Sequence, residues 1–439
     1  MSEYILGLDV GSSEVKAVIA KNENDDFSLI GIGKSQTSGV KKGKITNIEQ
    51  ASYSIKEAVR NAVEHAGVKY DKVIVSISGT YTDSVKSQGV INIENDEINI
   101  GDIKRAMQNA EKDADIKSDC IKLHVLPYNF KVDAQDNVED PLGMCGSRLE
   151  VTTHIITAPR SSILNLQKAV QMCGIKIDNI VLSGYASAIS TLTKDEKESG
   201  VALIDMGGST CDMIIHLGNS LRYNSVLPVG SSHITNDISS AIHTPLAKAE
   251  EIKIKYDELK NNTQEIEVPI IGDTKNTRKV SLEIIARVIF ARLEETIVCL
   301  GNNIKDSRCL EALSGGIVLT GGMVKLGDIR DLVVARFPNL SVRVAKPRNF
   351  YSGLSEISQD EANSCVIGLC MYGAGKFTPY EIDSNSQLRY KDINIKKPVE
   401  IAEDNLEEIK LDNSDIKIDN LEKSNSSFQK CMNWLKNLF

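Results

Sequence analysis

Residues 201–215 read VALIDMGGSTCDMII, and they repeat the pattern that opens the chain, YILGLDVGSSEVKAVIA at residues 4–20. In both stretches an apolar run ends at an aspartate, a short turn of glycine and small hydroxyl residues follows, and a second apolar run begins. Two apolar, β-rich runs across such a turn predict a β-hairpin. The repeat, at a separation of about two hundred residues, predicts two similar halves that face each other.

Composition narrows the class of protein. The chain has 439 residues, enough for two to four domains at about 100–200 residues each, and its 41% hydrophobic content can bury sizeable cores. Its formal net charge of -9 opposes a sequence-independent attraction to phosphates, so nucleic acid is not an expected partner. Nine cysteines without a C-x-x-C pair predict reduced thiols in a cytosol. The sequence predicts neither an export signal nor a membrane span.

Apolar periodicity predicts the remaining elements. Recurrence at three and four residues predicts helices at 48–66, 102–113, 161–173, 245–259, 282–300 and 360–372. Short β-rich runs predict strands at 73–78, 90–93, 122–126, 151–156, 177–182, 265–271 and 316–319. The short strands between residues 85 and 159 surround one helix and predict an inserted subdomain. Residues 379–427 lose the periodicity and carry twelve acidic against seven basic residues, which predicts a disordered acidic linker.

The two hairpin turns have the composition that a nucleotide triphosphate requires. Glycine and small hydroxyl residues let backbone N–H groups approach phosphate oxygens closely. Asp9 and Asp205 precede these turns, and together they would hold a Mg²⁺ on the phosphate chain. Lys16 would add a positive charge, and the pair Gly321 and Gly322 would let the backbone lie flat against a nucleoside. One such turn alone is more often an ordinary β-turn, but three such elements predict a site for ATP and Mg²⁺.

Three strings carry a resemblance to a known superfamily. DVGSSEVK at 9–16, DMGGSTCD at 205–212 and GIVLTGGM at 316–323 resemble the phosphate-1, phosphate-2 and adenosine motifs of the actin/Hsp70/hexokinase superfamily. Within it, the chain is similar to the bacterial cell-division family FtsA. That likeness covers nearly the whole chain and includes LPYNFKVDAQDNVEDPLGMCGSRLEVTTHIIT at 126–157 and LPVGSSHITNDI at 227–238.

The resemblance implies a fold and a division into subdomains. The expected fold is α/β: an actin-like, two-lobed fold with ribonuclease H-like halves, an inserted subdomain 1C and a C-terminal amphipathic helix. The expected ranges are 1–84 and 160–198 with helix 360–378 for subdomain 1A, 85–159 for 1C, 199–237 and 306–359 for 2A, 238–305 for 2B, 379–427 for the linker and 428–439 for a membrane-targeting helix.

The resemblance also implies a nucleotide site. Its members would be the Mg²⁺-side aspartates Asp9 and Asp205, the phosphate cradle of Gly11, Ser12, Ser13, Lys16, Gly207, Gly208, Ser209 and Thr210, and the nucleoside wall of Gly321, Gly322 and Met323. Glu251 and Lys253 are candidate ribose or adenine contacts, with a solvated helix face as the alternative. Residues 180–186 carry no acid or amide that could activate an acceptor. We therefore expect weak or no ATPase activity, with ATP as a structural switch.

The chain end has an amphipathic pattern. Wound at 100° per residue, residues 428–439 gather the apolar side chains on one side and the lysines on the other. The expected membrane-binding residues are Phe428, Lys430, Met432, Trp434, Leu435, Lys436, Leu438 and Phe439. A helix docked on the parent core is the alternative. The preceding linker of about 49 residues favours an interfacial membrane helix, because a docked helix needs no such tether.

Similarity to FtsA implies partners and a location. The expected partners are the C-terminal peptide of the tubulin-like FtsZ, further copies of the chain in filaments, anionic lipid of the inner membrane and later division proteins. Arg292 and Glu295 match positions that contact the FtsZ peptide on subdomain 2B, and an exposed ion-paired face is their alternative role. The expected location is the cytoplasmic face of the bacterial inner membrane at the division site. The alternative functions are an ATPase or phosphotransferase of the superfamily, and an actin-like pilus-assembly adaptor.

Overall fold

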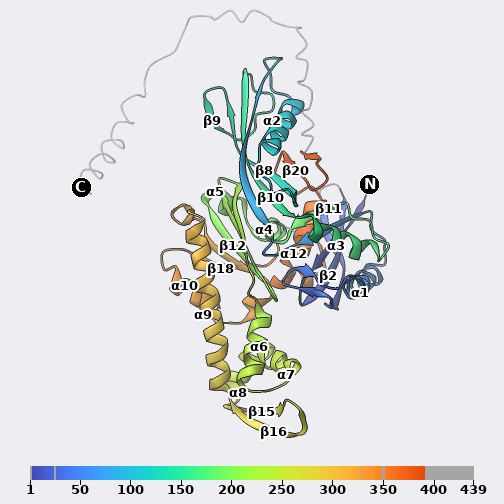
Figure 1. Cartoon of the computed structure of the whole chain (residues 1–439), viewed down its shortest axis with the longest axis vertical. Coiled ribbons are helices and arrows are strands. Elements are labelled where there is room, and N and C mark those ends of the chain that lie inside the picture. Colours follow the sequence, from blue (N-terminus) through green and yellow to red (C-terminus); the bar gives the residue numbers. More distant parts are fainter. Residues whose placement is uncertain (1, 24–25, 328, 349–351, 391–439) are drawn as a thin grey trace, which may run out of the picture. The chain divides into compact units, whose positions relative to one another are not determined.

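A computed structural model describes residues 2–390 except for 24–25, 328 and 349–351 (Figure 1). Residue contacts divide the chain after residue 391, so these residues belong to one unit. Within it, no helix is both long enough and apolar enough to cross a membrane. The predicted helix at 428–439 and residues 391–427 of the predicted linker lie outside the described residues.

The first half of the repeat forms a six-stranded sheet. Its strands, in spatial order, are β11 (Asn179–Leu182), β6 (Lys72–Ile77), β1 (Glu3–Val10), β2 (Glu14–Glu23), β3 (Asp26–Gln36) and β19 (Ser352–Gly353). β1 pairs antiparallel with β2 and parallel with β6, which confirms the first predicted hairpin. Helix α1 (Ile48–Ala66) has the predicted bounds, because Asn47 caps its first turn and Gly67 ends it in a left-handed conformation.

The second half repeats this arrangement in five strands. The spatial order is β14 (Ser220–Leu227), β13 (Cys211–Leu217), β12 (Val201–Met206), β17 (Gly316–Thr320) and β18 (Val342–Val344). β12 pairs antiparallel with β13 and parallel with β17, as β1 does with β2 and β6. The predicted internal repeat is therefore confirmed at the level of strand order and direction.

Two buried helices pack against each other beside these sheets: α4 (Ser183–Thr191) and α12 (Ser364–Gly373) (Figure 1). A Cβ added at Gly368 would lie 1.8 Å from the carbonyl oxygen of Ala186, so the two backbones touch there. Cys365 and Cys370 are buried on α12 and pack in the core. Helix α4 was not predicted, because every one of its residues is buried and it has no polar face to show periodicity.

The inserted subdomain has its own sheet and core. It consists of β7 (Asp83–Asn92), α2 (Ile100–Lys112), β8 (Cys120–Val132), β9 (Gln135–Val138) and β10 (Arg148–Pro159). Two later strands, β20 (Glu381–Ile382) and β21 (Leu388–Arg389), extend this sheet along β8. The core is formed mainly by α2 against β8 and β10.

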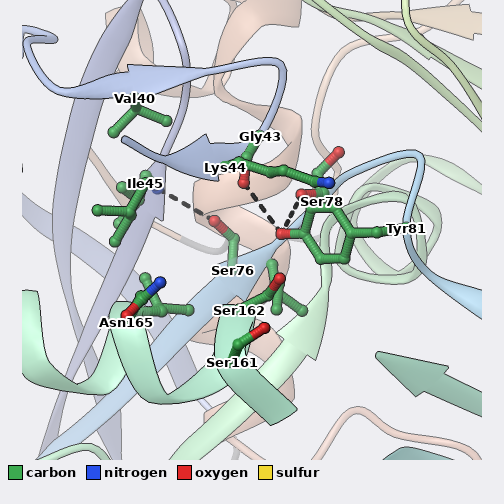
Figure 2. A pocket seen from close by; sticks show the side chains of 13 residues that line it. Val40, Gly43, Lys44, Ile45, Ser76, Ser78, Tyr81, Ser161, Ser162 and Asn165 are labelled. Carbon is green, nitrogen blue, oxygen red and sulfur yellow. Dashed lines mark hydrogen bonds between the residues drawn. The ribbon is translucent and has the colours of Figure 1, made fainter. Parts of the chain in front are cut away.

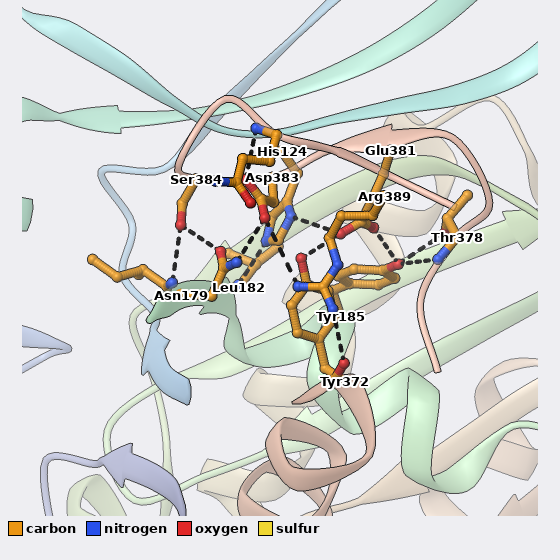
Figure 3. Close-up of polar contacts among 12 residues, drawn as sticks. His124, Asn179, Leu182, Tyr185, Tyr372, Thr378, Glu381, Asp383, Ser384 and Arg389 are labelled. Carbon is orange, nitrogen blue, oxygen red and sulfur yellow. Dashed lines mark hydrogen bonds and ion pairs between the residues drawn. The ribbon is translucent and has the colours of Figure 1, made fainter. Parts of the chain in front are cut away.

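These two strands correct the predicted start of the disordered linker at residue 379. Figure 3 shows the segment bound into a polar network, with Glu381 and Asp383 buried. Tyr185 donates a hydrogen bond of 2.8 Å to Glu381, and Asn179 donates one of the same length to Asp383. Both partners lie about two hundred residues earlier in the chain, so a local count of charge could not reveal that these acids are neutralised.

The remaining elements complete the second half and connect the parts. Residues 231–306 contain α6 (Ser231–Ala241), α7 (Leu246–Ile254), α8 (Tyr256–Asn262), β15 (Glu265–Ile270), β16 (Asp273–Ser281) and the long α9 (Leu282–Asp306). Shorter elements are β4 (Val40–Lys41), β5 (Lys44–Ile45), α3 (Arg160–Gln171), α5 (Lys194–Ser199), η1 (Leu310–Ala312), η2 (Gly322–Lys325), α10 (Ile329–Arg336), α11 (Ser355–Ser358) and η3 (Glu361–Asn363).

Candidate functional site

A cleft of about 990 Å³ lies between the two halves and is lined by both hairpin turns. Fourteen of the residues predicted for the nucleotide site line it: Asp9, Gly11, Ser12, Ser13, Lys16, Asp205, Gly207, Gly208, Ser209, Thr210, Lys253, Gly321, Gly322 and Met323. The structure therefore brings together three motifs that lie up to about three hundred residues apart in the chain.

The turns approach each other so closely that side chains are excluded. A Cβ added at Gly208 would lie 2.0 Å from Ser13 Oγ, which belongs to the turn of the other half. Gly321 has a φ of 93°, and a Cβ there would lie 2.3 Å from Asp205 Oδ1. At Gly208 the bare backbone allows a phosphate to approach the main chain closely. The N–H of Gly321 instead donates a hydrogen bond of 3.2 Å to the carbonyl oxygen of Glu361.

The second turn is held in place by α6. The backbone N–H groups of Ser231 and Ser232 donate hydrogen bonds of 3.1 and 2.7 Å to the carbonyl oxygens of Gly207 and Gly208. His233 Nδ1 accepts a hydrogen bond of 3.2 Å from the N–H of Gly230. His233 therefore has a structural role at the start of α6.

The predicted aspartates are both bound by buried serines. Ser76 Oγ donates a hydrogen bond of 2.7 Å to Asp9, and Ser187 Oγ donates one of 2.5 Å to Asp205. Burial, together with the nearby charge of Asp9, raises the pKa of Asp205 to about 6. The groups around this buried carboxylate offset its negative charge only weakly. A bound cation would therefore stabilise it, which suits a cation site.

Asp212 is a third carboxylate of the cleft, and sequence reasoning missed it. Ser78 Oγ lies 2.8 and 2.9 Å from its two oxygens, and burial with the charge of Asp205 raises the pKa of Asp212 to about 7. In the two hairpins Asp205 stands opposite Asp212, as Asp9 stands opposite Lys16. Aligning the two repeats would have assigned Asp212 to the position of Lys16.

The cleft fits a Mg²⁺ that shares its ligands with a nucleotide. Among residues 2–390 as described, no group of three or more His, Cys, Asp or Glu side chains could hold a metal ion alone. Mg²⁺ commonly takes one or two carboxylates and completes its shell with phosphate oxygens and water. Asp9 and Asp205 are suited to this role, which stays a prediction.

Lys16 is tied to the short helix η3, which directly precedes the buried helix α12. Its Nζ donates a hydrogen bond of 2.5 Å to the carbonyl oxygen of Ala362 and lies 3.8 Å from the carboxylate of Glu14. The lysine is 8% exposed and lines the cleft, so its charge would act on a phosphate in a partly dehydrated setting.

Of the two nucleoside contacts predicted on α7, the structure places Lys253 in the cleft wall and Glu251 outside it. Lys253 is buried in the cleft wall, where its Nζ lies 2.7 Å from Glu250. Glu251 lies outside the cleft and pairs with Lys248 and Lys255 at 2.9 and 3.3 Å. Neighbouring helical residues point about 100° apart, so Glu250, and not Glu251, lines the cleft beside Lys253.

A smaller cavity of about 200 Å³ adjoins the cleft (Figure 2). Gly43 and Ser78 line both spaces. The serines that bind Asp9 and Asp212 lie in its wall opposite Ser161 and Ser162 of α3. Tyr81 closes one side, with its hydroxyl 2.9 Å from the carbonyl oxygen of Ser78. The cleft carboxylates are therefore supported by a second, polar layer.

Arg292 and Glu295 lie on α9, away from the cleft, in a shallow groove with Val288 and Ser240. Arg292 forms an ion pair with Asp237 at 2.6 Å and also pairs with Glu295. The guanidinium of Arg292 is half-buried by its partners, whereas Glu295 is largely exposed. Charged groups of this pair are therefore accessible at the groove. Peptide binding here stays a prediction.

Known proteins match the chain over most of its length. The family "Cell division protein FtsA" matches residues 202–368, and "SHS2 domain inserted in FTSA" matches residues 79–157. Cell division protein FtsA of Helicobacter pylori is 38% identical over 421 residues, which cover 88% of this chain and 85% of the relative. The Pseudomonas aeruginosa protein of the same name is 36% identical over 402 residues, which cover 90% and 95%.

Solved structures support the fold. A chain of the PilM–PilN type IV pilus biogenesis complex aligns with a TM-score of 0.61 at 15% identity and covers 84% of this chain and 98% of its own. MreB5 of Spiroplasma citri bound to ADP aligns with a TM-score of 0.50 at 14% identity, covering 84% and 95%. The fold is thus the predicted actin-like, two-lobed one with an inserted SHS2 domain. Together with the curated relatives, this means that the chain belongs to the FtsA family of cell division proteins.

Proposed function

We propose that this division protein binds ATP with Mg²⁺ between its halves, polymerises on the cytoplasmic membrane, anchors FtsZ filaments there and recruits later division proteins. The observation that carries the proposal is the cleft itself, in which two hairpin turns and a third glycine turn from different parts of the chain face one space. Phosphates bound to both hairpin turns would hold the two halves together. Bound nucleotide would therefore determine the conformation in which the protein assembles into a filament.

Hydrolysis is slow or absent in this proposal. Of residues 180–186, Ser183 lines the cleft, whereas the hydroxyl of Tyr185 is bonded to Glu381 outside it. Asp212 reaches the cleft from β13, where the single hydroxyl of Ser78 donates to its carboxylate and leaves further acceptor positions free. Slow hydrolysis is therefore expected from residues 180–186, which contain no acid or amide that could activate water.

Attachment to the membrane rests on the sequence of residues 428–439, which has the composition of an interfacial helix. We expect the full-length chain to sediment with vesicles of anionic phospholipid, and a chain ending at Ser427 to stay in the supernatant. Replacing Trp434 by glutamate in the full chain should reduce sedimentation in the same way, whereas Asn433→Gln should not. Equal sedimentation of the truncated chain, with or without ATP, would disprove anchoring through this segment.

Binding of the FtsZ C-terminal peptide is proposed for the groove beside Arg292. Arg292→Gln should weaken binding of the labelled peptide to the full-length chain at least ~10-fold, about 1.4 kcal/mol, as measured by fluorescence anisotropy. Arg287→Gln is the matched control, because Arg287 is exposed on the same helix and pairs with Glu283 outside the groove. Equal affinities of both variants would remove Arg292 from the binding site.

A further inference from the structure

A second large cavity lies at the ends of the elements that point away from the nucleotide cleft. Its volume is about 830 Å³. β13 runs from Asp212 in the cleft to His216 in this cavity, and α12 runs from Cys365 in the cleft to Met371 in the cavity. Because three lysines line it, Lys194, Lys197 and Lys376, we call it the lysine cavity.

The three lysines have no acidic counterpart within ion-pair distance in the part of the chain that the structure describes. Glu196, next to Lys197 in the sequence, is paired with Arg343 at 2.6 Å. Burial lowers the pKa of Lys197 to about 8, against the opposing attraction of the Glu196 carboxylate, so this ammonium group is partly desolvated. An added carboxylate in the cavity would stabilise it further.

His216 adds an unpartnered polar group. It lines the lysine cavity and is only 2% exposed, and its Nδ1 has no hydrogen-bond partner among the described residues. Burial, reinforced by the charge of Lys197, holds the pKa of His216 well below its usual value, so the ring is neutral. A buried imidazole without a partner costs stability, and a ligand that bonded to it would recover that cost.

Apolar side chains separate these polar groups. The lining includes Phe27, Ile189, Leu192, Met371 and Phe377. Arg389 lies 4.3 Å from the centroid of the Phe377 ring, but it does not line the cavity and pairs with Asp383 at 3.8 Å. Pockets of about 300–1,000 Å³ hold drug-sized ligands, so this cavity is large enough for several residues of a peptide.

We propose that the lysine cavity is a docking site for a short acidic peptide segment of a partner protein, one that carries apolar side chains between its carboxylates. Lys194 and Lys197 stand on α5 and Lys376 follows α12, so the ligand must supply separated negative charges with apolar groups between them. An acidic peptide does so, whereas a single lipid headgroup concentrates its charge at one point and nucleic acid lacks the apolar side chains. This site is distinct from the nucleotide cleft and from the groove of Arg292, and it does not depend on their proposed functions.

Selection from a library of random dodecapeptides tests the proposal. The library is selected on the full-length chain and counter-selected on a Lys194→Gln, Lys376→Gln variant, whose replaced side chains are exposed and do not support the core. We expect enriched peptides to be net negative with aliphatic or aromatic residues. Synthetic copies should bind the wild type and lose at least ~10-fold in affinity on the double variant, the tenfold corresponding to about 1.4 kcal/mol.

Controls separate this site from general charge effects. Lys168→Gln, an exposed lysine on α3 outside the cavity, should leave peptide affinity unchanged, and Lys197→Gln should lower it. A failure to enrich any peptide, or enrichment of neutral or basic ones, would overturn the proposal. Peptide binding that is equally strong in the double variant would also overturn it. The same holds if the double variant loses binding to phosphatidylglycerol vesicles but keeps peptide binding.

Discussion

Replacing Gly208 by valine is expected to weaken ATP binding at least ~100-fold, about 2.7 kcal/mol. A Cβ at this position would lie 2.0 Å from Ser13 Oγ and 2.9 Å from Ser13 Cβ, so the hydroxyl could rotate away but the rest of the side chain could not. The added methyl groups would occupy the space between the two hairpin turns. Because the φ of Gly208 is not in the left-handed region, valine should not strain the backbone, and the clash is confined to the contact between the two turns.

The measurement is an equilibrium titration of the full-length chain with a fluorescent ATP analogue in the presence of Mg²⁺. Ser13→Gly is the matched partner variant, because it removes both atoms that the valine would meet. The double variant should recover a substantial part of the lost affinity. The change in its binding free energy should therefore differ clearly from the sum of the changes in the two single variants. An affinity of Gly208→Val within threefold of the wild type would show that phosphates do not bind across the two turns.

Prediction from sequence succeeded where the chemistry is local. An aspartate, a small turn and two apolar runs specify a hairpin without reference to the rest of the chain, and both predicted hairpins are present. The residues of these turns were also located correctly in one cleft, because a repeated hairpin places equivalent residues at equivalent points of two facing halves.

Prediction failed where the environment of a residue depends on contacts with distant parts of the chain. It also failed where the rotation of a helix about its axis determines which side chain faces the cleft. Glu381 looks like one more acid in an acidic stretch, and only Tyr185 and Tyr372 explain its burial. Glu251 was chosen over Glu250 because the sequence does not give the rotational phase of a short helix. Asp212 was overlooked because its role depends on Asp205, its partner across the hairpin.

Replacing Glu381 by glutamine is expected to change how stability depends on pH. Burial raises the pKa of this carboxyl to about 7, against an ordinary value of 4.5 for an unfolded chain. The folded state therefore binds more protons than the unfolded state between these values, so the contribution of Glu381 to stability falls as the pH rises from 4.5 to 7. The difference amounts to about 2–3 kcal/mol in the free energy of unfolding. A glutamine does not titrate, so this component should vanish in the variant.

The test compares urea unfolding of the wild type and Glu381→Gln at pH 5, 6, 7 and 8 at constant ionic strength. The stability of the wild type relative to the variant should decrease by about 2–3 kcal/mol between pH 5 and pH 8.

Asp205 and Asp212 titrate in the same range in both proteins, so their contributions cancel in the difference. His124, 3.9 Å from Glu381, does not interfere, because burial lowers its pKa to about 3. Glu64→Gln, on the exposed face of α1, is the control for the removal of a surface carboxylate at each pH. A constant difference for Glu381→Gln would mean that the carboxyl stays ionised in the fold and that Arg389 compensates its charge.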